Sequence, residues 1–324
     1  MAQKEPSRHH YLPRLLLRKF VNSSGNLWGY DALEQKKFPT SPKAAGVEVN
    51  FHSIKTKTGE VDRTTIEEIF DKQIERPGNV AIGRLIKRET LTDEQAGNFM
   101  RFVAAQFVRT PEGLAQRSAL VAPVLQESLE RMAKFDKEFR RRVTKELTDR
   151  KYSQDKIDAL FKQLQNGKVR TVPTREFLFR LMLQQINSVA KQLCRLGWRY
   201  CTLDDADPDL VIGDHPVTLQ YVGPPGSSQR LGLANLNVEL AIPLGRRTVA
   251  IAEKGARTYY ALAAVGTAKD LNDGMMRAAH RFVYASVDSD ELLKRFIRLH
   301  GTGPKVRTMK MQAEGRTMIV SEFR

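Results

Sequence analysis

The stretch Gly197-Trp198-Arg199-Tyr200-Cys201-Thr202-Leu203 divides the chain into two patterns. Before it, apolar residues mostly recur at the spacing of helices. After it, short apolar runs are separated by Gly, Pro and Asp turns, which is typical of strands. Helices and strands that are segregated along a chain favour an α+β fold. We therefore predict a helical N-terminal and central region with a smaller mixed β-sheet in the C-terminal part.

Caps and prolines mark the helix boundaries upstream of Gly197. The segment 64–76 places its apolar residues on one helical face, and Pro77-Gly78 should end that helix. Thr92-Asp93-Glu94-Gln95 is a capping box, in which the Thr hydroxyl and the Gln amide each satisfy a backbone donor. The helix that it opens should run to Arg109, because Thr110-Pro111 favours an extended backbone.

Two further helical stretches complete the central part. The stretch 112–147 contains Pro123 and should be kinked or split there, because proline removes a backbone donor and clashes with the preceding turn. A later helix starts at Pro173-Thr174 and ends at Gly197. We divide the chain into an irregular N-terminal segment (1–62), a helical region (63–197), an α+β region (198–300) and a basic C-terminal tail (301–324). By composition, residues 223–228 form a mobile loop.

The charge of the chain is its most unusual property. Among 324 residues, 53 are Lys or Arg and 37 are Asp or Glu, which gives a formal net charge of +16. Between Arg131 and Arg170 there are 13 basic and 6 acidic residues, with Arg140-Arg141-Arg142 at the centre. A positive field of this kind attracts phosphates, so we expect a polyanionic partner, most plausibly a nucleic acid. A basic surface that serves only solubility is the alternative.

The cellular setting follows from the cysteines and from the apolar runs. Cys194 and Cys201 are the only cysteines, and their spacing suits neither a disulfide framework nor a zinc site. The N-terminus lacks the apolar core of a secretion signal, and no apolar run reaches the length that spans a bilayer. We expect a cytoplasmic protein that neither crosses nor binds a membrane, of unknown oligomeric state.

Four segments resemble a known family. They are His9-His10-Tyr11-Leu12-Pro13 with Leu17-Arg18-Lys19-Phe20, then Gln106-Phe107-Val108-Arg109-Thr110-Pro111, then Gly213-Asp214-His215-Pro216-Val217, and Leu271-Asn272 with Arg281-Phe282-Val283-Tyr284. In this order the chain resembles the bacterial domain of unknown function family numbered 4238, from about His9 to Tyr284. The resemblance implies that these segments lie together, and it implies no reaction.

The first of these segments offers a phosphate site. His10, with Arg14 and Arg18 on the following turn, could hold a phosphate, because the guanidinium fork matches its oxygens. His10 is also a candidate catalytic group. In the alternative interpretation, His10 hydrogen-bonds a backbone carbonyl and Arg18 pairs with a carboxylate.

The second segment places two polar side chains on one helix face. Gln106 and Arg109 are three residues apart on a face that is otherwise apolar. This arrangement indicates either a substrate clamp or a buried polar network. We keep both interpretations.

Asp214 is the candidate catalytic carboxylate, and His215 beside it is a candidate substrate-binding residue. Both follow a predicted strand, where active-site residues are common. Asp214 could bind a divalent metal such as Mg²⁺ or orient a base. It could equally form an Asx turn before Pro216. The acidic residue and lysine that a metal-dependent nuclease would carry on a nearby strand are not found at Glu239 or Glu253. Glu34-Gln35-Lys36 has the required spacing, but it lies far upstream in the irregular segment.

Three functions therefore compete. The first is a nucleic-acid-binding protein, which could be a metal-assisted nuclease of defence or mobile-element type. The second is a small-molecule enzyme with a pocket around His10, Gln106, Arg109 and Asp214. The third is a module that binds an acidic protein. Phosphate-loop, His-Glu-x-x-His, Cys-x-x-Cys and Gly-x-Ser-x-Gly motifs are absent from the sequence.

Overall fold

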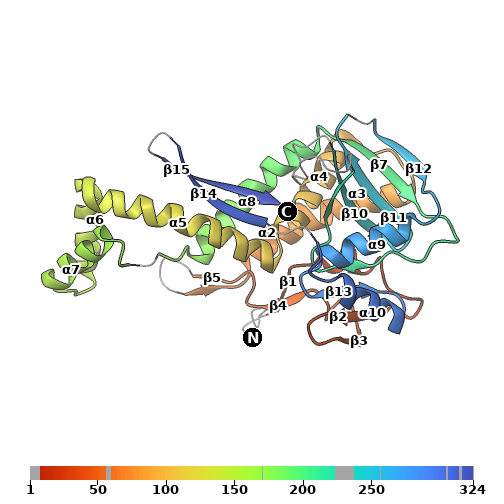
Figure 1. The fold of residues 1–324 in the computed structure, drawn as a ribbon, viewed down its shortest axis with the longest axis horizontal. Coiled ribbons are helices and arrows are strands. Elements are labelled where there is room, and N and C mark those ends of the chain that lie inside the picture. Colours follow the sequence, from red (N-terminus) through yellow and green to blue (C-terminus); the bar gives the residue numbers. More distant parts are fainter. Residues whose placement is uncertain are drawn as a thin grey trace. The chain divides into compact units, whose positions relative to one another are not determined.

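The computed structural model describes residues 8–55, 60–169, 171–222, 237–255, 257–303, 306–313 and 316–323. The fold is α+β, as predicted (Figure 1). The loop predicted at 223–228 lies outside the described residues. Two compact units are present. The first takes its residues from Met1–Gly113, Phe179–Arg307 and Ser321–Arg324, and the second from Leu114–Leu178 and Thr308–Val320.

A five-stranded sheet in the order β12-β7-β11-β10-β9 belongs to the first unit (Figure 1). Its strands are β7 (Gly197–Thr202), β9 (Thr218–Tyr221), β10 (Val238–Gly245), β11 (Thr248–Glu253) and β12 (Tyr259–Leu262). Only β12 and β7 pair in parallel; the other neighbours are antiparallel. The central strands β10 and β11 are buried along nearly their whole length, because both of their faces are covered. The predicted change of pattern at Gly197 is therefore confirmed.

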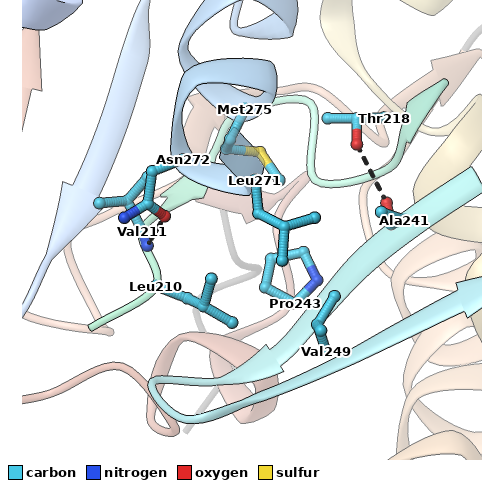
Figure 2. A pocket seen from close by; sticks show the side chains of 9 residues that line it. All are labelled: Leu210, Val211, Thr218, Ala241, Pro243, Val249, Leu271, Asn272 and Met275. Carbon is cyan, nitrogen blue, oxygen red and sulfur yellow. Dashed lines mark hydrogen bonds between the residues drawn. The ribbon is translucent and has the colours of Figure 1, made fainter. Parts of the chain in front are cut away.

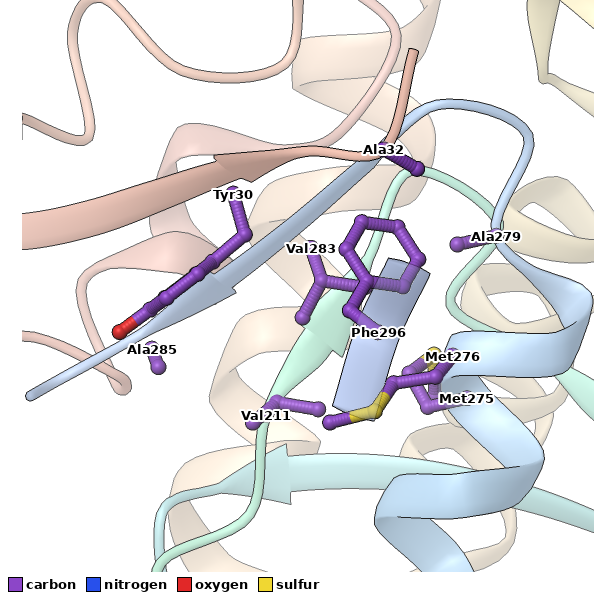
Figure 3. Close-up of a cluster of buried hydrophobic side chains, with 9 residues drawn as sticks. All are labelled: Tyr30, Ala32, Val211, Met275, Met276, Ala279, Val283, Ala285 and Phe296. Atoms are coloured by element: carbon purple, nitrogen blue, oxygen red, sulfur yellow. The ribbon is translucent and has the colours of Figure 1, made fainter. Parts of the chain in front are cut away.

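A second, four-stranded sheet pairs strands from the N-terminal part of the chain with strands from its C-terminal part. Its order is β3-β2-β13-β8, with β2 (Leu27–Asp31), β3 (Lys36–Thr40), β8 (Ile212–Gly213) and β13 (Phe282–Ala285). Helices α9 (Thr267–Ala278) and α10 (Asp290–Leu299) belong to the same part of the unit. Figure 3 shows the apolar cluster between them, in which Tyr30, Val283, Met276 and Phe296 are fully buried.

The helix predicted at 64–76 does not end at Pro77-Gly78. Instead α2 (Thr65–Phe70), the π-helical turn η1 (Asp71–Glu75) and α3 (Arg76–Ile86) follow one another without a break. Pro77 is the second residue of α3 and directly follows the π-helical turn, so its missing backbone N–H falls where the helix changes its hydrogen-bond pattern. The wider π turn before it makes room for the proline ring. The sequence rule failed because a local change of helix type removes the usual clash.

Gly78 is required where α3 packs against the next helix, α4 (Asp93–Val108). A Cβ atom at this position would lie 2.5 Å from Cβ of Phe102, so only glycine permits this approach. The capping box at the start of α4 is formed as predicted: Gln95 N donates to Thr92 Oγ1 over 3.3 Å, and Thr92 N donates to Gln95 Oε1 over 3.0 Å. The helix ends at Arg109, also as predicted.

The stretch predicted at 112–147 is split, but not at Pro123. Helix α5 (Pro111–Phe135) continues through the proline, and the break lies at Asp136, whose carboxylate caps α6 (Lys137–Asp149) by accepting a hydrogen bond from Phe139 N over 2.9 Å. An N-cap aspartate is a strong helix start and here defines the boundary. Helix α7 (Gln154–Gln165), which the sequence analysis did not predict, follows.

The remaining elements are short, apart from one helix and the last two strands. They are α1 (Arg14–Leu17), α8 (Arg175–Leu193), β1 (Arg8–His10), β4 (Val47–Val49), β5 (Ile54–Lys55), β6 (Val61–Asp62), β14 (Val306–Ala313) and β15 (Arg316–Phe323). The tail predicted at 301–324 thus contains two paired strands. None of the helices in the described parts of the chain is both long and apolar enough to cross a bilayer.

Candidate functional site

A buried polar network occupies the part of the first unit where β1, η1 and α4 meet. Strand β1 pairs with β4 and directs His9 inward, where it is fully buried. Nδ1 of His9 accepts a hydrogen bond from His52 N over 3.0 Å, and Nε2 lies 2.9 Å from the carbonyl oxygen of Arg63. Since Nδ1 is an acceptor, the proton of the His9 ring is on Nε2, which donates to Arg63. His9 thus positions the backbone of His52.

His52 is paired with Glu67. Its Nδ1 makes a short hydrogen bond to Oε2 of Glu67, and its ring is fully buried. Burial lowers the pKa of His52 to about 4, although Glu67 acts in the opposite direction. Burial alone would raise the pKa of Glu67, but the hydrogen bond from His52 and the nearby positive charge of Arg109 together contribute to a net downward shift. A neutral His52 that donates from Nδ1 to an ionised Glu67 satisfies both shifts.

This arrangement leaves the other nitrogen of His52 unprotonated. With the proton on Nδ1, Nε2 carries a lone pair and can only accept a hydrogen bond. Within the described residues, this buried atom has no hydrogen-bond partner. A carboxylate that orients a histidine in this way prepares it to accept a proton or a hydrogen bond from a bound molecule.

Arg109 ends α4 beside this pair. Its guanidinium carbon lies 4.2 Å from the centre of the Phe70 ring, on which the His52 ring also stacks, with 5.2 Å between centroids. Nη1 of Arg109 forms an ion pair with Oε1 of Glu75 over 2.7 Å, and the guanidinium is fully buried. Burial raises the pKa of Glu75 even though the charge of Arg109 opposes the shift. The guanidinium is therefore held between a carboxylate and an aromatic face.

Gln106 lies one turn before Arg109 on α4 and is 1% exposed. Neither Oε1 nor Nε2 of its amide has a hydrogen-bond partner among the described residues, and the same holds for Nε and Nη2 of Arg109. A buried polar atom without a partner costs about 1–3 kcal/mol. So many unpaired atoms in one network indicate a place where a further molecule binds, whether water or ligand.

His10 faces the edge of the same region. Its ring is half-buried, and Nε2 has no partner among the described residues. Burial lowers the pKa of His10, while the nearby Glu67 raises it. Of the candidate residues, Gln106 and Arg109 thus share helix α4, and His10 lies near Glu67. The role of His10 as a catalytic group stays a prediction.

Asp214 has different partners. Its carboxylate accepts hydrogen bonds from the backbone N–H groups of His280, Arg281 and Phe282, over 2.7, 2.8 and 2.8 Å. Burial raises the pKa of Asp214, and these three donors act against the shift. The side chain therefore holds the end of β8 to the start of β13. Its metal-binding and catalytic roles stay predictions.

The remaining predicted residues are Arg14, Arg18 and His215. Arg14 and Arg18 are exposed on and just after α1. The His215 ring contacts the ring of Phe107, with 6.3 Å between centroids. Phosphate binding by the two arginines stays a prediction.

Sequence reasoning missed His9 as a buried residue, and it missed His52, Glu67 and Glu75 altogether. The two glutamates lie in a helical segment that the sequence analysis interpreted only through its apolar residues. His52 lies outside any regular element. One signal was available: Glu67 and Glu75 stand eight residues apart, which places them near one face of a helical segment.

Two hollows lie elsewhere in the first unit. One is a cavity of about 10 Å³ beside Leu271, Asn272 and Met275, which has room for about one water. Figure 2 shows the side chains that line it. A wide surface hollow of about 480 Å³ is lined by residues such as Asn22, Trp28 and Ser41. Over the described residues, no group of three or more His, Cys, Asp or Glu side chains is arranged to hold a metal ion.

The second unit presents the basic surface. All 12 Lys and Arg residues described between 131 and 168 are exposed. On α6, Phe139, Val143 and Leu147 pack against the core that α5 and α7 provide. Four-residue spacing puts Lys137, Arg141 and Lys145 on the opposite face of α6. We call these three residues the α6 basic face.

The family whose model is described as "Protein of unknown function (DUF4238)" matches residues 8–289. The chain belongs to the DUF4238 family. The resemblance predicted from the four sequence segments is thereby confirmed. The match spans both sheets of the first unit and the α6 basic face. No curated protein and no solved structure matches the chain.

Proposed function

We propose that this DUF4238 protein binds nucleic acid through the α6 basic face of its second unit. The carrying observation is the concentration of exposed cations on a helix whose apolar side is already used for packing. Cations on such a face are exposed to solvent at helical spacing, so they can contact successive phosphates of a nucleic-acid backbone.

The packing of the second unit supports a stable platform. Ala133, Ile157 and Phe161 are buried between the helices, and Gln165 Nε2 donates to Ala133 O over 2.9 Å. Arg140 adds a cation–π contact, with its guanidinium carbon 5.3 Å from the centre of the Phe161 ring. The basic face is thus carried by a packed set of helices, which keeps the positions of its charges.

Charge pairing removes few of the cations. Arg141 donates two hydrogen bonds to Glu138, and Arg150 pairs with Glu146 over 2.6 Å. Exposed pairs of this kind contribute at most about 1 kcal/mol and exchange readily for a phosphate contact. The second unit therefore stays strongly positive, which favours rapid, sequence-independent association with a polyanion.

The direct test is binding of the whole chain to single- and double-stranded DNA and RNA at about 50 mM salt, where phosphate contacts are strong. We expect the triple variant Lys137→Ala, Arg141→Ala and Lys145→Ala to bind at least about tenfold more weakly, because a protein with fewer cations releases fewer counterions from the nucleic acid when it binds. Alanine keeps the helix, since it is the best helix former. Unchanged affinity would contradict the proposal.

A matched control removes the same charge from the first unit. Arg101, Lys191 and Lys269 are exposed on α4, α8 and α9. Their triple alanine variant has the same net charge as the α6 variant, so a difference between the two assigns binding to the α6 basic face. Equal losses would mean that only total charge matters. Binding of an acidic protein or polyglutamate, in preference to nucleic acid, would favour the protein-binding alternative.

Cleavage is a separate part of the proposal. The same assay with Mg²⁺, with Mn²⁺ and with EDTA asks whether the protein is a metal-assisted nuclease of defence or mobile-element type. An Asp214→Ala variant that binds but no longer cleaves would support a catalytic Asp214. A cytoplasmic location belongs to the proposal as well, because Cys194 and Cys201 are free thiols, as a reducing compartment favours.

A further inference from the structure

The buried network of the first unit holds more hydrogen-bonding capacity than its own residues use. Nε2 of His52, both amide atoms of Gln106, and Nε and Nη2 of Arg109 are buried and unpaired among the described residues. A network that served stability alone would pair these atoms or replace them by apolar groups. His52 and Arg109 both pack on the Phe70 ring, and Gln106 lies three residues before Arg109 on α4. The unpaired set includes both donors and acceptors.

The charges of the network decide what it can take. Arg109 is paired with Glu75, and Glu67, which is hydrogen-bonded to the neutral His52, adds a second carboxylate whose pKa the charge of Arg109 also lowers. An incoming anion would therefore meet two carboxylates in a water-poor site, and an incoming cation would meet Arg109. A neutral polar group avoids both costs.

The unpaired atoms specify that group further. Nε and Nη2 of Arg109 only donate, so they require an acceptor such as a carbonyl oxygen. Nε2 of His52 only accepts, so it requires an N–H or O–H donor. The Gln106 amide offers one of each. A carbonyl with an adjacent N–H offers both the acceptor and the donor that these side chains require.

We propose that His52, Gln106 and Arg109 form a buried binding site for a neutral amide-type group, that is, a carbonyl with an adjacent N–H. Glu67 positions the His52 ring, and Glu75 positions the Arg109 guanidinium. Amides, lactams and the imide edge of a nucleobase share this chemistry. The site belongs to the first unit, so this proposal can be tested independently of nucleic-acid binding by the α6 basic face.

The first arm of the test measures stability. Gln106→Leu replaces an unpaired buried amide by an apolar group of similar size, so the ligand-free variant should melt about 2 °C or more above the wild type. Asn272→Leu is the matched control, because its amide is fully used: Oδ1 accepts from Val211 N over 2.9 Å and Nδ2 donates to Asp209 O over 3.0 Å. Asn272→Leu should melt at a lower temperature than the wild type. A Gln106→Leu variant that loses stability as Asn272→Leu does would overturn the proposal.

The second arm measures binding with defined probes. In ¹⁵N-histidine spectra of the full chain, acetamide should shift the Nε2 signal of His52 in a saturable way, whereas acetate and methylammonium should leave it in place. The signal is assigned by its loss in His52→Gln. Gln106→Leu should abolish the acetamide response. A response that does not saturate, that persists in Gln106→Leu, or that acetate reproduces would contradict the proposal. A series of N-methylacetamide, 2-pyrrolidone and uracil then separates open amides, lactams and imide edges.

Discussion

At the scale of single residues, the buried carboxylate of Asp214 fixes the backbone of residues 280–282 through hydrogen bonds. Three backbone N–H groups of residues 280–282 point at its two oxygens. In Asp214→Asn, the side-chain N–H₂ would face donors, so at least one buried N–H would lose its acceptor. We expect a loss of about 1–3 kcal/mol in the free energy of unfolding. Urea titration of the variant measures it. A variant as stable as the wild type would show that these amides have other partners.

The His52–Glu67 pair makes stability depend on pH. The pKa of His52 is lowered to about 4 in the folded protein, against about 6.5 in an unfolded chain, so protonation favours unfolding. Its contribution is present above about pH 6.5 and is lost as the pH falls towards 4, by about 2 kcal/mol at pH 5. The lowered pKa of Glu67 acts in the same direction at lower pH.

Comparison with a variant isolates this contribution from other titrating groups. His52→Gln cannot titrate, so the difference in unfolding free energy between wild type and variant should shrink as the pH falls from 7 to 5. Urea titrations of both proteins at the two pH values provide the measurement. A difference that stays constant, or grows towards pH 5, would show that His52 is protonated in the folded state.

At the scale of elements, the contact of α3 with α4 depends on one glycine. A methyl group at Gly78 would lie 2.5 Å from Cβ of Phe102, whereas one at Gly83 of the same helix would meet nothing within 4 Å. Gly78→Ala should therefore destabilise the protein by about 1–3 kcal/mol through overpacking. Gly83→Ala should stabilise it by about 0.5–1 kcal/mol through helix propensity. Thermal unfolding of the pair provides the check; two changes of the same sign would mean that α3 does not pack on α4 as described.

Elements fixed by local chemistry could be predicted, and those that depend on tertiary packing could not. The capping box of α4 and the change of pattern at Gly197 are local signals, and both were confirmed. Pro77 failed as a stop signal because a π turn accommodates it, and the break in the basic helical stretch follows the cap at Asp136 instead of Pro123. In both cases the expected effect of a proline was outweighed by another local feature, the π turn at Pro77 and the Asp136 cap downstream of Pro123.

Only part of the candidate site could be predicted from the sequence, again because the rest depends on tertiary packing. Gln106 and Arg109 attracted attention because polar residues on an apolar helix face need partners. Glu75, which pairs with Arg109, and the hydrogen-bonded pair of His52 and Glu67 come from separate turns and helices, which only the fold brings together. The sequence segments that identified the family therefore contain one part of the network and not the other.

At the scale of the whole molecule, the account places two activities on two units. The first unit holds a buried polar network, and the second unit carries exposed positive charge. Their independence is itself a prediction: Gln106→Leu should leave nucleic-acid affinity unchanged, and the α6 triple variant should keep the acetamide response of His52. Loss of both activities in either variant would contradict this independence, and fluorescence anisotropy together with the ¹⁵N spectra distinguishes the cases.

The central claim is that the α6 basic face contacts the phosphate backbone, and the salt dependence of affinity tests it most directly. Affinity for duplex DNA should be measured between about 50 and 200 mM salt for the wild type and for the triple variant of Lys137, Arg141 and Lys145. Each phosphate contact contributes about 0.9 to the slope of log affinity against log salt. The account predicts a steep slope for the wild type, lowered by about two to three in the variant. A flat wild-type slope, or equal slopes for the two proteins, would contradict it.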